Sequence, residues 1–512
     1  MSEVVEIRSF SGPVMPIRSR VTINSNSQMP LRDTPPSLLL SSSSATPSPF
    51  FSAVDDIEAL NINNSNMLVE LNPRPQDAWL PITESRDGNA YYAAFHTLCS
   101  GIGMHGLLLP VAFTVLGWTW GIICLTLAFL WQLYTIYLLV QLHESAETGM
   151  RCSRYLQLCS ATFGQKIAQS MFLFPIIDLS AGTCMLLTIV GGSDMSTFFG
   201  TLCDTICISR PLTTADWYLV FTCGTVILSQ LPNLNSIACV SLMGAISSVS
   251  YYTLLWAVPV TEGRLPNISD PPMPENTQNS AVLDVVNALG IIAFAFRGHN
   301  LILEIQATMP SNEKFPSHVP MWKGVKSAYS IIAVCLFPLA IGGYWAYGHM
   351  IPKEGGMLVA LYMFHGSDAS RFVIELTSLL LLISTACSFP IYAMPIFDGM
   401  ESLYTSRTNK PCPWWLRGIF RIMFGFLCFF LAVAISFYGT LGSLGGGFSL
   451  PLTLAVPCFM WIKIKKPEVY SPMWWLNWGL GLLGMALSGI LIVAGVFAVM
   501  KTGIEVKFFK PR

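Results

Sequence analysis

The sequence predicts an all-α polytopic membrane protein with about eleven transmembrane helices, of which the first and the sixth are broken in the middle. Composition is one reason: 53% of the 512 residues are hydrophobic and 11% are charged, whereas soluble domains carry roughly 25% charged residues. Apolar runs of roughly 17–25 residues, each long enough to cross a bilayer, are the second reason. We expect each run to be helical because a helix pairs all of its backbone groups within lipid.

The apolar runs place the predicted spans in chain order. They lie at 91–116, 119–142, 167–192, 215–232, 235–260, 281–303, 326–348, 372–396, 418–439, 448–462 and 478–500. This placement predicts a disordered cytoplasmic N-terminal tail at 1–88, a transmembrane domain at 89–500 and a short C-terminal tail at 501–512. Residues 1–88 are rich in Ser, Asn and Pro, a composition with little apolar surface to bury, which favours disorder.

Glycine and polar residues interrupt two spans. The first span reads Ala-Phe-His-Thr-Leu-Cys-Ser-Gly-Ile-Gly-Met-His-Gly from Ala94, and the sixth reads Ala-Phe-Ala-Phe-Arg-Gly-His-Asn from Ala293. Hydrocarbon cannot satisfy the free N–H and C=O groups of an interrupted helix, so each break must be buried in protein or face a polar cavity. Two such breaks at matching places in the chain are typical of secondary transporters built from two repeats.

Loop charges predict that the N-terminus is cytoplasmic. In that orientation most loop Lys and Arg residues, such as Arg154, Lys323 and Lys463, lie on the inner side, as the positive-inside rule requires. Asn267, in the sequence Asn-Ile-Ser, then falls in an outer loop as a glycosylation acceptor. A net charge of −1 argues against nucleic acid as a partner. The lipid bilayer is the expected partner, and the oligomeric state stays open.

The two breaks offer a physical basis for a site that binds an amino acid. Half-helix N-termini present free N–H groups to a carboxylate, and exposed carbonyl groups suit an ammonium group. The alternative is that the glycines only permit close helix packing. The predicted substrate-binding residues are Thr97, Ser100, Gly101, Gly103 and His105 in the first break, and Phe294, Ala295, Phe296 and Gly298 in the second.

Ionisable residues inside predicted spans mark candidate functional positions, because charge is costly to bury in a bilayer. Asp178, in the third span, is a candidate proton carrier or, equally, a structural ion-pair partner of Arg297. Arg297 either binds a carboxylate with its fork of donors or serves as the counter-charge of Asp178. His105 and His299 titrate near neutral pH and are candidates for proton coupling, with hydrogen-bonded packing as the alternative.

Several motifs resemble those of plant lysine/histidine transporter-like proteins in the amino acid/auxin permease family. The resemblance covers roughly residues 80–500 and implies a leucine-transporter-like inverted repeat, uptake of amino acids and coupling to protons. Relatives commonly carry glycine at the position of His105 and a small residue at the position of Arg297. The similar segments are 295–310, which begins Ala-Phe-Arg-Gly-His-Asn, Phe95-His96, Val-Leu-Gly-Trp at 115–118, Tyr-Ala-Met-Pro-Ile-Phe-Asp at 392–398, 457–467 and Trp-Trp-Leu-Asn-Trp at 474–478.

The sequence therefore predicts a secondary active amino-acid transporter, with proton-coupled uptake at the plasma membrane by alternating access. Two alternatives stay open: an amino-acid sensor with little flux, and an exporter or organellar transporter of an amino-acid derivative. An enzyme is not expected, because no nucleophile–base pair recurs at helical spacing. No metal site or cofactor is predicted, and the proton is the expected coupling ion.

Overall fold

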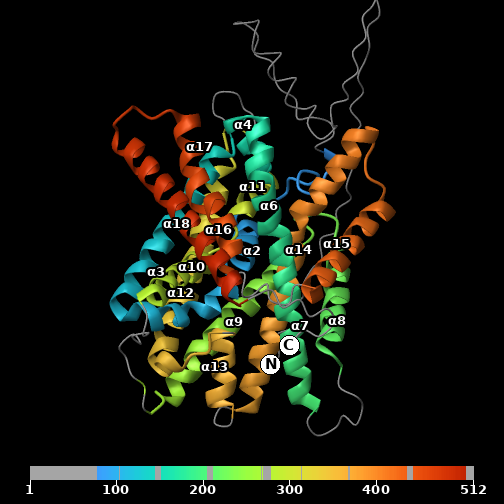
Figure 1. The fold of residues 1–512 in the computed structure, drawn as a ribbon. Coiled ribbons are helices and arrows are strands. Elements are labelled where there is room, and N and C mark those ends of the chain that lie inside the picture. The colour runs from blue at the N-terminus through green and yellow to red at the C-terminus, as the bar shows by residue number, and fades with distance from the viewer. Residues whose placement is uncertain are drawn as a thin grey trace, which may run out of the picture. The chain divides into compact units, whose positions relative to one another are not determined.

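The computed structural model describes residues 78–102, 104–144, 151–203, 212–266, 268, 278–312, 314–353, 355–366, 370–434 and 442–502. The regular secondary structure of these residues is helical, and their β-type pairing consists of isolated bridges (Figure 1). The expectations for the N-terminal tail up to residue 77, for Gly103 and for Asn267 lie outside the described residues.

The helices follow one another in the order that the apolar runs predict. Up to residue 262 they are α2 (Ala90–Gly101), η2 (Met104–Leu108), α3 (Leu109–Leu142), α4 (Tyr155–Phe163), α5 (Gln165–Ile167), η3 (Ala168–Phe172), α6 (Leu173–Ile177), η4 (Asp178–Gly182), α7 (Thr183–Cys203), α8 (Thr214–Leu228) and α9 (Ala238–Glu262). The later ones are α10 (Gln278–Ala295), α11 (His299–Ala307), α12 (His318–Tyr347), η5 (Gly348–Met350), α13 (Gly356–His365), α14 (Arg371–Thr408), α15 (Trp414–Ala434), α16 (Gly442–Leu450), η6 (Pro451–Ala455), α17 (Val456–Lys465) and α18 (Pro472–Thr502).

The predicted all-α polytopic fold is confirmed. Eight helical stretches of the described chain are long and apolar enough to cross a membrane, and three shorter apolar helices accompany them. Every predicted span overlaps one or more of the helices, whereas the count of about eleven crossings stays a prediction.

A tight bend, and no loop, separates the first two predicted spans. Helix α3 continues from the first span into the second and bends at Gly117, where φ is 70° and ψ is −179°. Positive φ is open to glycine because it lacks a Cβ atom. The chain therefore turns at Gly117 within a continuous apolar sequence, between the predicted spans 91–116 and 119–142.

Helix α13 was not predicted. Its sequence is as apolar as a span but only ten residues long, too short for the length criterion used to find spans. Figure 1 shows α13 at the end of the bundle opposite α4. Its buried residues include Met357 and Leu361, so it closes that end of the bundle by packing.

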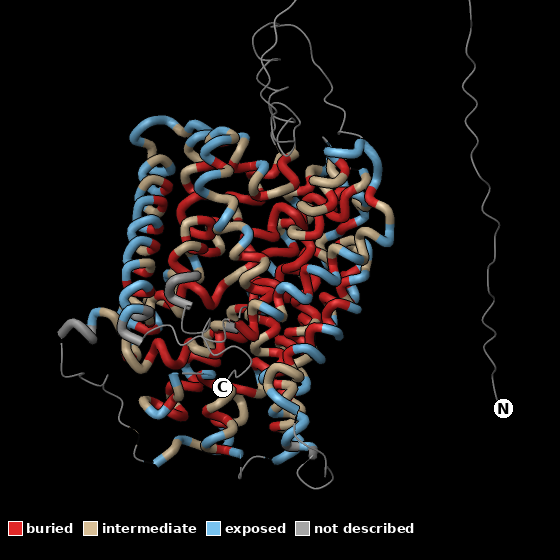
Figure 2. Tube along the Cα trace, turned by 45° about the vertical axis from the view of Figure 1, so that its right-hand side comes forward, coloured by how far each residue is buried: buried red, intermediate tan, exposed pale blue. Residues whose placement is uncertain are grey.

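Burial separates an inner core from an apolar outer surface. Figure 2 shows buried segments concentrated inside the bundle and exposed positions along the outer faces of the helices. On α15 and α18 these exposed positions include Ile422, Met423, Phe426, Leu482 and Leu483. An extended apolar surface of this kind marks contact with other molecules, and here it fits a lipid-facing belt.

Residues 78–88, which belong to the predicted N-terminal tail, are within the described part of the chain. Leu80, Ile82 and Thr83 are buried, and the N–H of Ile82 donates to Asp398 Oδ1 at 3.2 Å. The N–H of Gly88 donates to the carbonyl of Thr308 at 2.9 Å. Residues 78–88 thus pack on the transmembrane domain, because their few apolar side chains meet α14 and neighbouring elements that are distant in sequence.

Candidate functional site

Both predicted breaks are present, and they pair with each other. Helix α2 ends at Gly101, and α10 ends at Ala295 before α11 starts at His299. Between them, Ile102 and Phe296 form an antiparallel bridge, and the N–H of Arg297 donates to the carbonyl of Gly101 at 3.2 Å. Backbone groups freed by one break are therefore satisfied by the other, as a bundle interior requires.

The glycines at the breaks are needed for backbone conformation and close approach. Gly298 has φ 95°, in the left-handed region, and a Cβ atom there would lie 3.0 Å from Ser100 Oγ. A Cβ atom at Gly101 would lie 2.7 Å from Ile332 Cδ1. The packing role that the sequence left open therefore applies at both positions.

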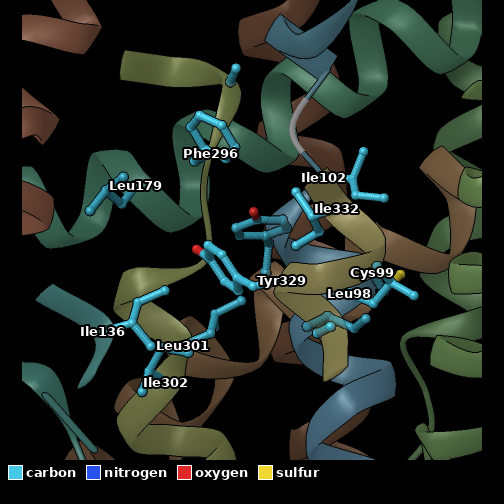
Figure 3. Close-up of a cluster of buried hydrophobic side chains, with 14 of the residues drawn as sticks. Leu98, Cys99, Ile102, Ile136, Leu179, Phe296, Leu301, Ile302, Tyr329 and Ile332 are labelled. Atoms are coloured by element: carbon cyan, nitrogen blue, oxygen red, sulfur yellow. The ribbon is translucent and has the colours of Figure 1, made fainter. Parts of the chain in front are cut away.

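The paired breaks are enclosed by apolar side chains. Figure 3 shows Phe296 and Ile102 from the two breaks near Tyr329 and Ile332 of α12. The ring of Phe296 lies 5.7 Å from that of Phe129, centroid to centroid. Ala295 is fully buried. These contacts hold the breaks in one position and keep lipid away from them.

A cavity lies beside the paired breaks. It is narrow, with a volume of about 20 Å³, and draws residues from the first break, α7, α9, the second break and α14. Its polar side chains are mostly hydroxyl groups, and one positive charge, that of Arg297, faces it. The lining residues are Cys99, Ile102, Thr183, Leu187, Tyr251, Arg297, Ser384, Thr385, Ser388 and Tyr392.

The contribution of α14 was missed by sequence analysis. The hydroxyl of Tyr392 donates to the carbonyl of Ser100 at 2.5 Å, and Ser388 Oγ donates to the carbonyl of Cys99 at 3.2 Å. Two carbonyl groups at the end of α2, which have no partner within that helix, are thus capped by α14. The available signal was the run of hydroxyl residues Ser384, Thr385, Ser388 and Tyr392, which falls on one side of a helix.

A second, smaller cavity lies on the other side of Arg297. Its volume is about 10 Å³, and Phe294 and Phe296 line it together with Arg297, Ser449 and other residues of the tenth predicted span. The Arg297 guanidinium lies 5.5 Å from the centroid of the Phe294 ring. The ring of His105 is 5.1 Å from the same phenyl ring. Phe294 therefore contacts two of the predicted site residues, Arg297 and His105.

Asp178 begins the π-helical turn η4 within the third predicted span. Its Oδ2 accepts a hydrogen bond from Ser449 Oγ at 3.1 Å, and Ser449 lines the second cavity. Asp178 and Arg297 thus approach this cavity from different elements. The predicted ion pair between them is not formed within the described part of the chain.

His299 and Thr97 lie in the packed interior. His299 is fully buried, and its Nε2 is 3.0 Å from Thr135 Oγ1 and 3.3 Å from the carbonyl of Gln132. Thr97 is buried in α2, and Ser100 Oγ donates within the same helix to the carbonyl of His96 at 2.7 Å. The geometry of His299 is that of a hydrogen-bonded packing residue, the alternative left open by the sequence.

Asp194 is a buried carboxylate that sequence analysis overlooked. It lies in α7 and is 4% exposed, and its Oδ1 accepts from Ser378 Oγ at 3.0 Å. Ser378 Oγ is also hydrogen-bonded to the hydroxyl of Tyr362 on α13. The predicted third span stopped at residue 192, which placed Asp194 in a loop. The helix continues to Cys203.

The end of the bundle that carries α4 is closed by a polar network. Arg154 Nε lies 2.5 Å from Asp398 Oδ2, and the other oxygen of Asp398 accepts from Ile82. Glu304 Oε1 accepts from the N–H of Tyr155 at 3.4 Å. The network joins α4, α11, α14 and the segment 78–88, which are far apart in the chain.

Comparison with known proteins gives consistent matches. The family model described as "Transmembrane amino acid transporter protein" matches residues 86–501. Lysine histidine transporter-like 8 of Arabidopsis thaliana is 53% identical over 444 residues, which cover 87% of this chain and 85% of that protein. Lysine histidine transporter-like 7 of the same organism is 43% identical over 441 residues, covering 85% and 90%.

A solved structure supports the fold. The manganese transporter of Eremococcus coleocola superposes with a TM-score of 0.51 at 12% identity, covering 88% of this chain and 93% of that one. At this identity the likeness concerns the fold alone. It agrees with the leucine-transporter-like arrangement that the motif resemblance implied.

Proposed function

The chain belongs to the transmembrane amino acid transporter family, and from this premise we propose that it is a proton-coupled amino-acid symporter of the plasma membrane. The resemblance to lysine/histidine transporter-like proteins is confirmed by the relatives. Because the family is one of transporters, the expectation that the chain is not an enzyme is confirmed as well. The cavity beside the paired breaks is the observation that carries the proposal.

The cavity has the lining of a site for a small polar solute. Small-molecule sites have volumes of roughly 300–1,000 Å³, so this cavity, at about 20 Å³, has to widen during the transport cycle before it holds a substrate. Tyr251, Ser384 and Thr385 offer hydroxyl groups, and Ile102 and Leu187 offer apolar contacts. A single amino acid fits these properties better than a peptide.

Alternating access requires that one end of the bundle open while the other stays closed. In our proposal the Arg154–Asp398 ion pair and the docked segment 78–88 form the inner closure. Inward opening then breaks this ion pair and releases Ile82 from Asp398. Both contacts are polar and near the end of the bundle, where water can replace them when they separate.

Proton coupling needs a titratable group that changes protonation during the cycle. Asp178 is our first candidate, because it lies within a span and its partner Ser449 lines the second cavity. Neutralising one carboxylate there changes the charge balance around Arg297, which lines the same cavity. Asp194, buried near α13, is a second candidate at the opposite end of the bundle from α4.

Uptake into proteoliposomes tests the function. The purified full-length chain is reconstituted, and accumulation of each labelled common amino acid is measured with an inward proton gradient. We expect accumulation of at least one amino acid that a protonophore abolishes. Uptake that ignores the gradient would refute proton coupling. Ligand-induced thermal stabilisation without any uptake would instead support a sensor.

A further inference from the structure

Arg297 is a positive charge placed at the centre of the candidate site. Its backbone N–H is fixed by the carbonyl of Gly101, and its side chain lines both cavities. The guanidinium lies over the Phe294 ring, which holds it between the two. Of the side chains lining either cavity, that of Arg297 is the one that carries a charge.

This charge has no carboxylate partner within the described part of the chain. Other arginines there form ion pairs with Glu144, Asp398, Glu375 and Glu401, whereas Arg297 forms no ion pair with any described residue. Arg297 is half-buried, and an uncompensated cation inside a membrane protein is costly. A ligand that brings negative charge removes that cost.

The carbonyl groups at the two breaks still offer acceptors to the α-ammonium group of a substrate. Those of Ser100 and Gly101 each accept one hydrogen bond, from Tyr392 and from the N–H of Arg297, and a carbonyl oxygen has a second lone pair. At the end of α10, the carbonyl of Ala293 accepts from Gln132 Nε2 at 2.9 Å. Discrimination by side-chain charge therefore depends on Arg297, which makes the site electropositive.

We propose that Arg297 makes this transporter selective for amino acids with a net negative charge, such as glutamate and aspartate, over neutral and cationic ones. The inference rests on the amino-acid transport proposed above and names its substrate class. The planar fork of arginine binds a carboxylate with two parallel hydrogen bonds. A lysine substrate would place a second positive charge beside Arg297 in a cavity where water screens it weakly, which gives repulsion as well as lost attraction.

The test compares glutamate with glutamine, which have nearly the same shape and differ by one charge. Uptake by the purified full-length chain is measured at pH 7, together with lysine as a cationic substrate. For the unmodified protein we expect an apparent KM for glutamate about tenfold or more below that for glutamine, and lysine weaker than both. Arg297→Gln is expected to bring the glutamate-to-glutamine ratio to about one.

Two further variants keep the test decisive. Arg297→Lys retains the charge and is expected to keep a reduced preference for glutamate. This variant still tests the inference if Arg297→Gln does not fold. Arg371→Gln makes the same charge change at an exposed pair with Glu375 and is expected to keep the full preference. An unmodified protein that prefers lysine or glutamine, or an Arg297→Gln variant that still prefers glutamate, would overturn the inference.

Binding separates this inference from the transport proposal. Thermal unfolding of the purified protein is followed with glutamate, glutamine and lysine, without any gradient. Stabilisation by glutamate that is lost in Arg297→Gln supports the selectivity even if no uptake occurs, in which case transport alone fails. Uptake of glutamine with no stabilisation by glutamate leaves transport standing and refutes the selectivity.

Discussion

The N–H of Arg297 and the carbonyl of Gly101 form a 3.2 Å hydrogen bond that joins the break in the sixth predicted span to the break in the first. The bond, with the neighbouring Ile102–Phe296 bridge, holds the two half-helix ends together. We therefore expect a change in either break to affect the other, and with it both cavities that Arg297 lines.

Gly298→Val is expected to disrupt this junction. A branched side chain is strained at φ 95°, and its Cβ would press on Ser100 Oγ at 3.0 Å. We expect a loss of about 1–2 kcal/mol in folding stability and a loss of substrate binding, measured by thermal unfolding with and without ligand. Gly479→Ala, where a Cβ meets nothing within 4 Å, is the control and should unfold normally.

Tyr392→Phe tests the cap that α14 places on α2. The change removes the donor to the carbonyl of Ser100 and leaves a buried acceptor without its partner, which costs about 1–3 kcal/mol. The cavity also loses a hydroxyl group, so uptake is expected to fall along with the melting temperature. Tyr91→Phe, at a position 73% exposed, is the control and should change neither uptake nor melting temperature. If Tyr392→Phe changes neither of them, the cap has no role in stability or uptake.

Asp398→Asn is expected to favour inward opening, because it removes the negative partner of Arg154. Cys152 is a native reporter: it lies two residues before Arg154 in the sequence, and burial raises the pKa of its thiol to about 11. Opening exposes this thiol, so its alkylation, followed by mass spectrometry, should accelerate in the variant. Glu375→Gln, which removes the negative partner of Arg371 in an exposed ion pair, is the control. If the unmodified protein, Asp398→Asn and Glu375→Gln are alkylated at the same rate, Asp398 does not contribute to the inner closure.

Acidification is expected to destabilise the protein through His143. Burial, Arg151 and Arg86 hold the pKa of this imidazole well below 6.5, although Glu144 Oε1 is 3.8 Å away. Since the unfolded state binds a proton below about pH 6.5 and the folded state does not, stability is lost as pH falls through that value, by up to about 1.4 kcal/mol per unit. The melting temperature of His143→Gln should therefore decrease less between pH 7.5 and 5.5.

Asp178→Asn is expected to abolish accumulation driven by a proton gradient while leaving exchange of substrate across the membrane. The asparagine still accepts a hydrogen bond from Ser449 but cannot bind and release a proton. Counterflow in proteoliposomes measures exchange, and gradient-driven uptake measures coupling. Asp194→Asn is the matched comparison; if it alone loses coupling, the proton carrier is Asp194.

The helical fold and the place of its breaks were predictable from local sequence. Lipid forces an apolar run to be helical whatever surrounds it, and glycine with polar residues marks where such a helix stops. The spans, the breaks at Gly101 and Gly298 and the involvement of Arg297 with a cavity follow from these rules. Helix α13 was not predicted by these rules because, with ten residues, it is too short to be recognised as a span.

The partners of the breaks were decided by tertiary structure. No periodicity in the sequence indicates that Tyr392 reaches Ser100, that Ile82 reaches Asp398 or that Gly101 pairs with Arg297. These contacts join residues far apart in the chain, and they depend on which faces of the helices pack together. The sequence alone determined what must be helical and where a polar break needs a partner, whereas packing decided which partner satisfies it.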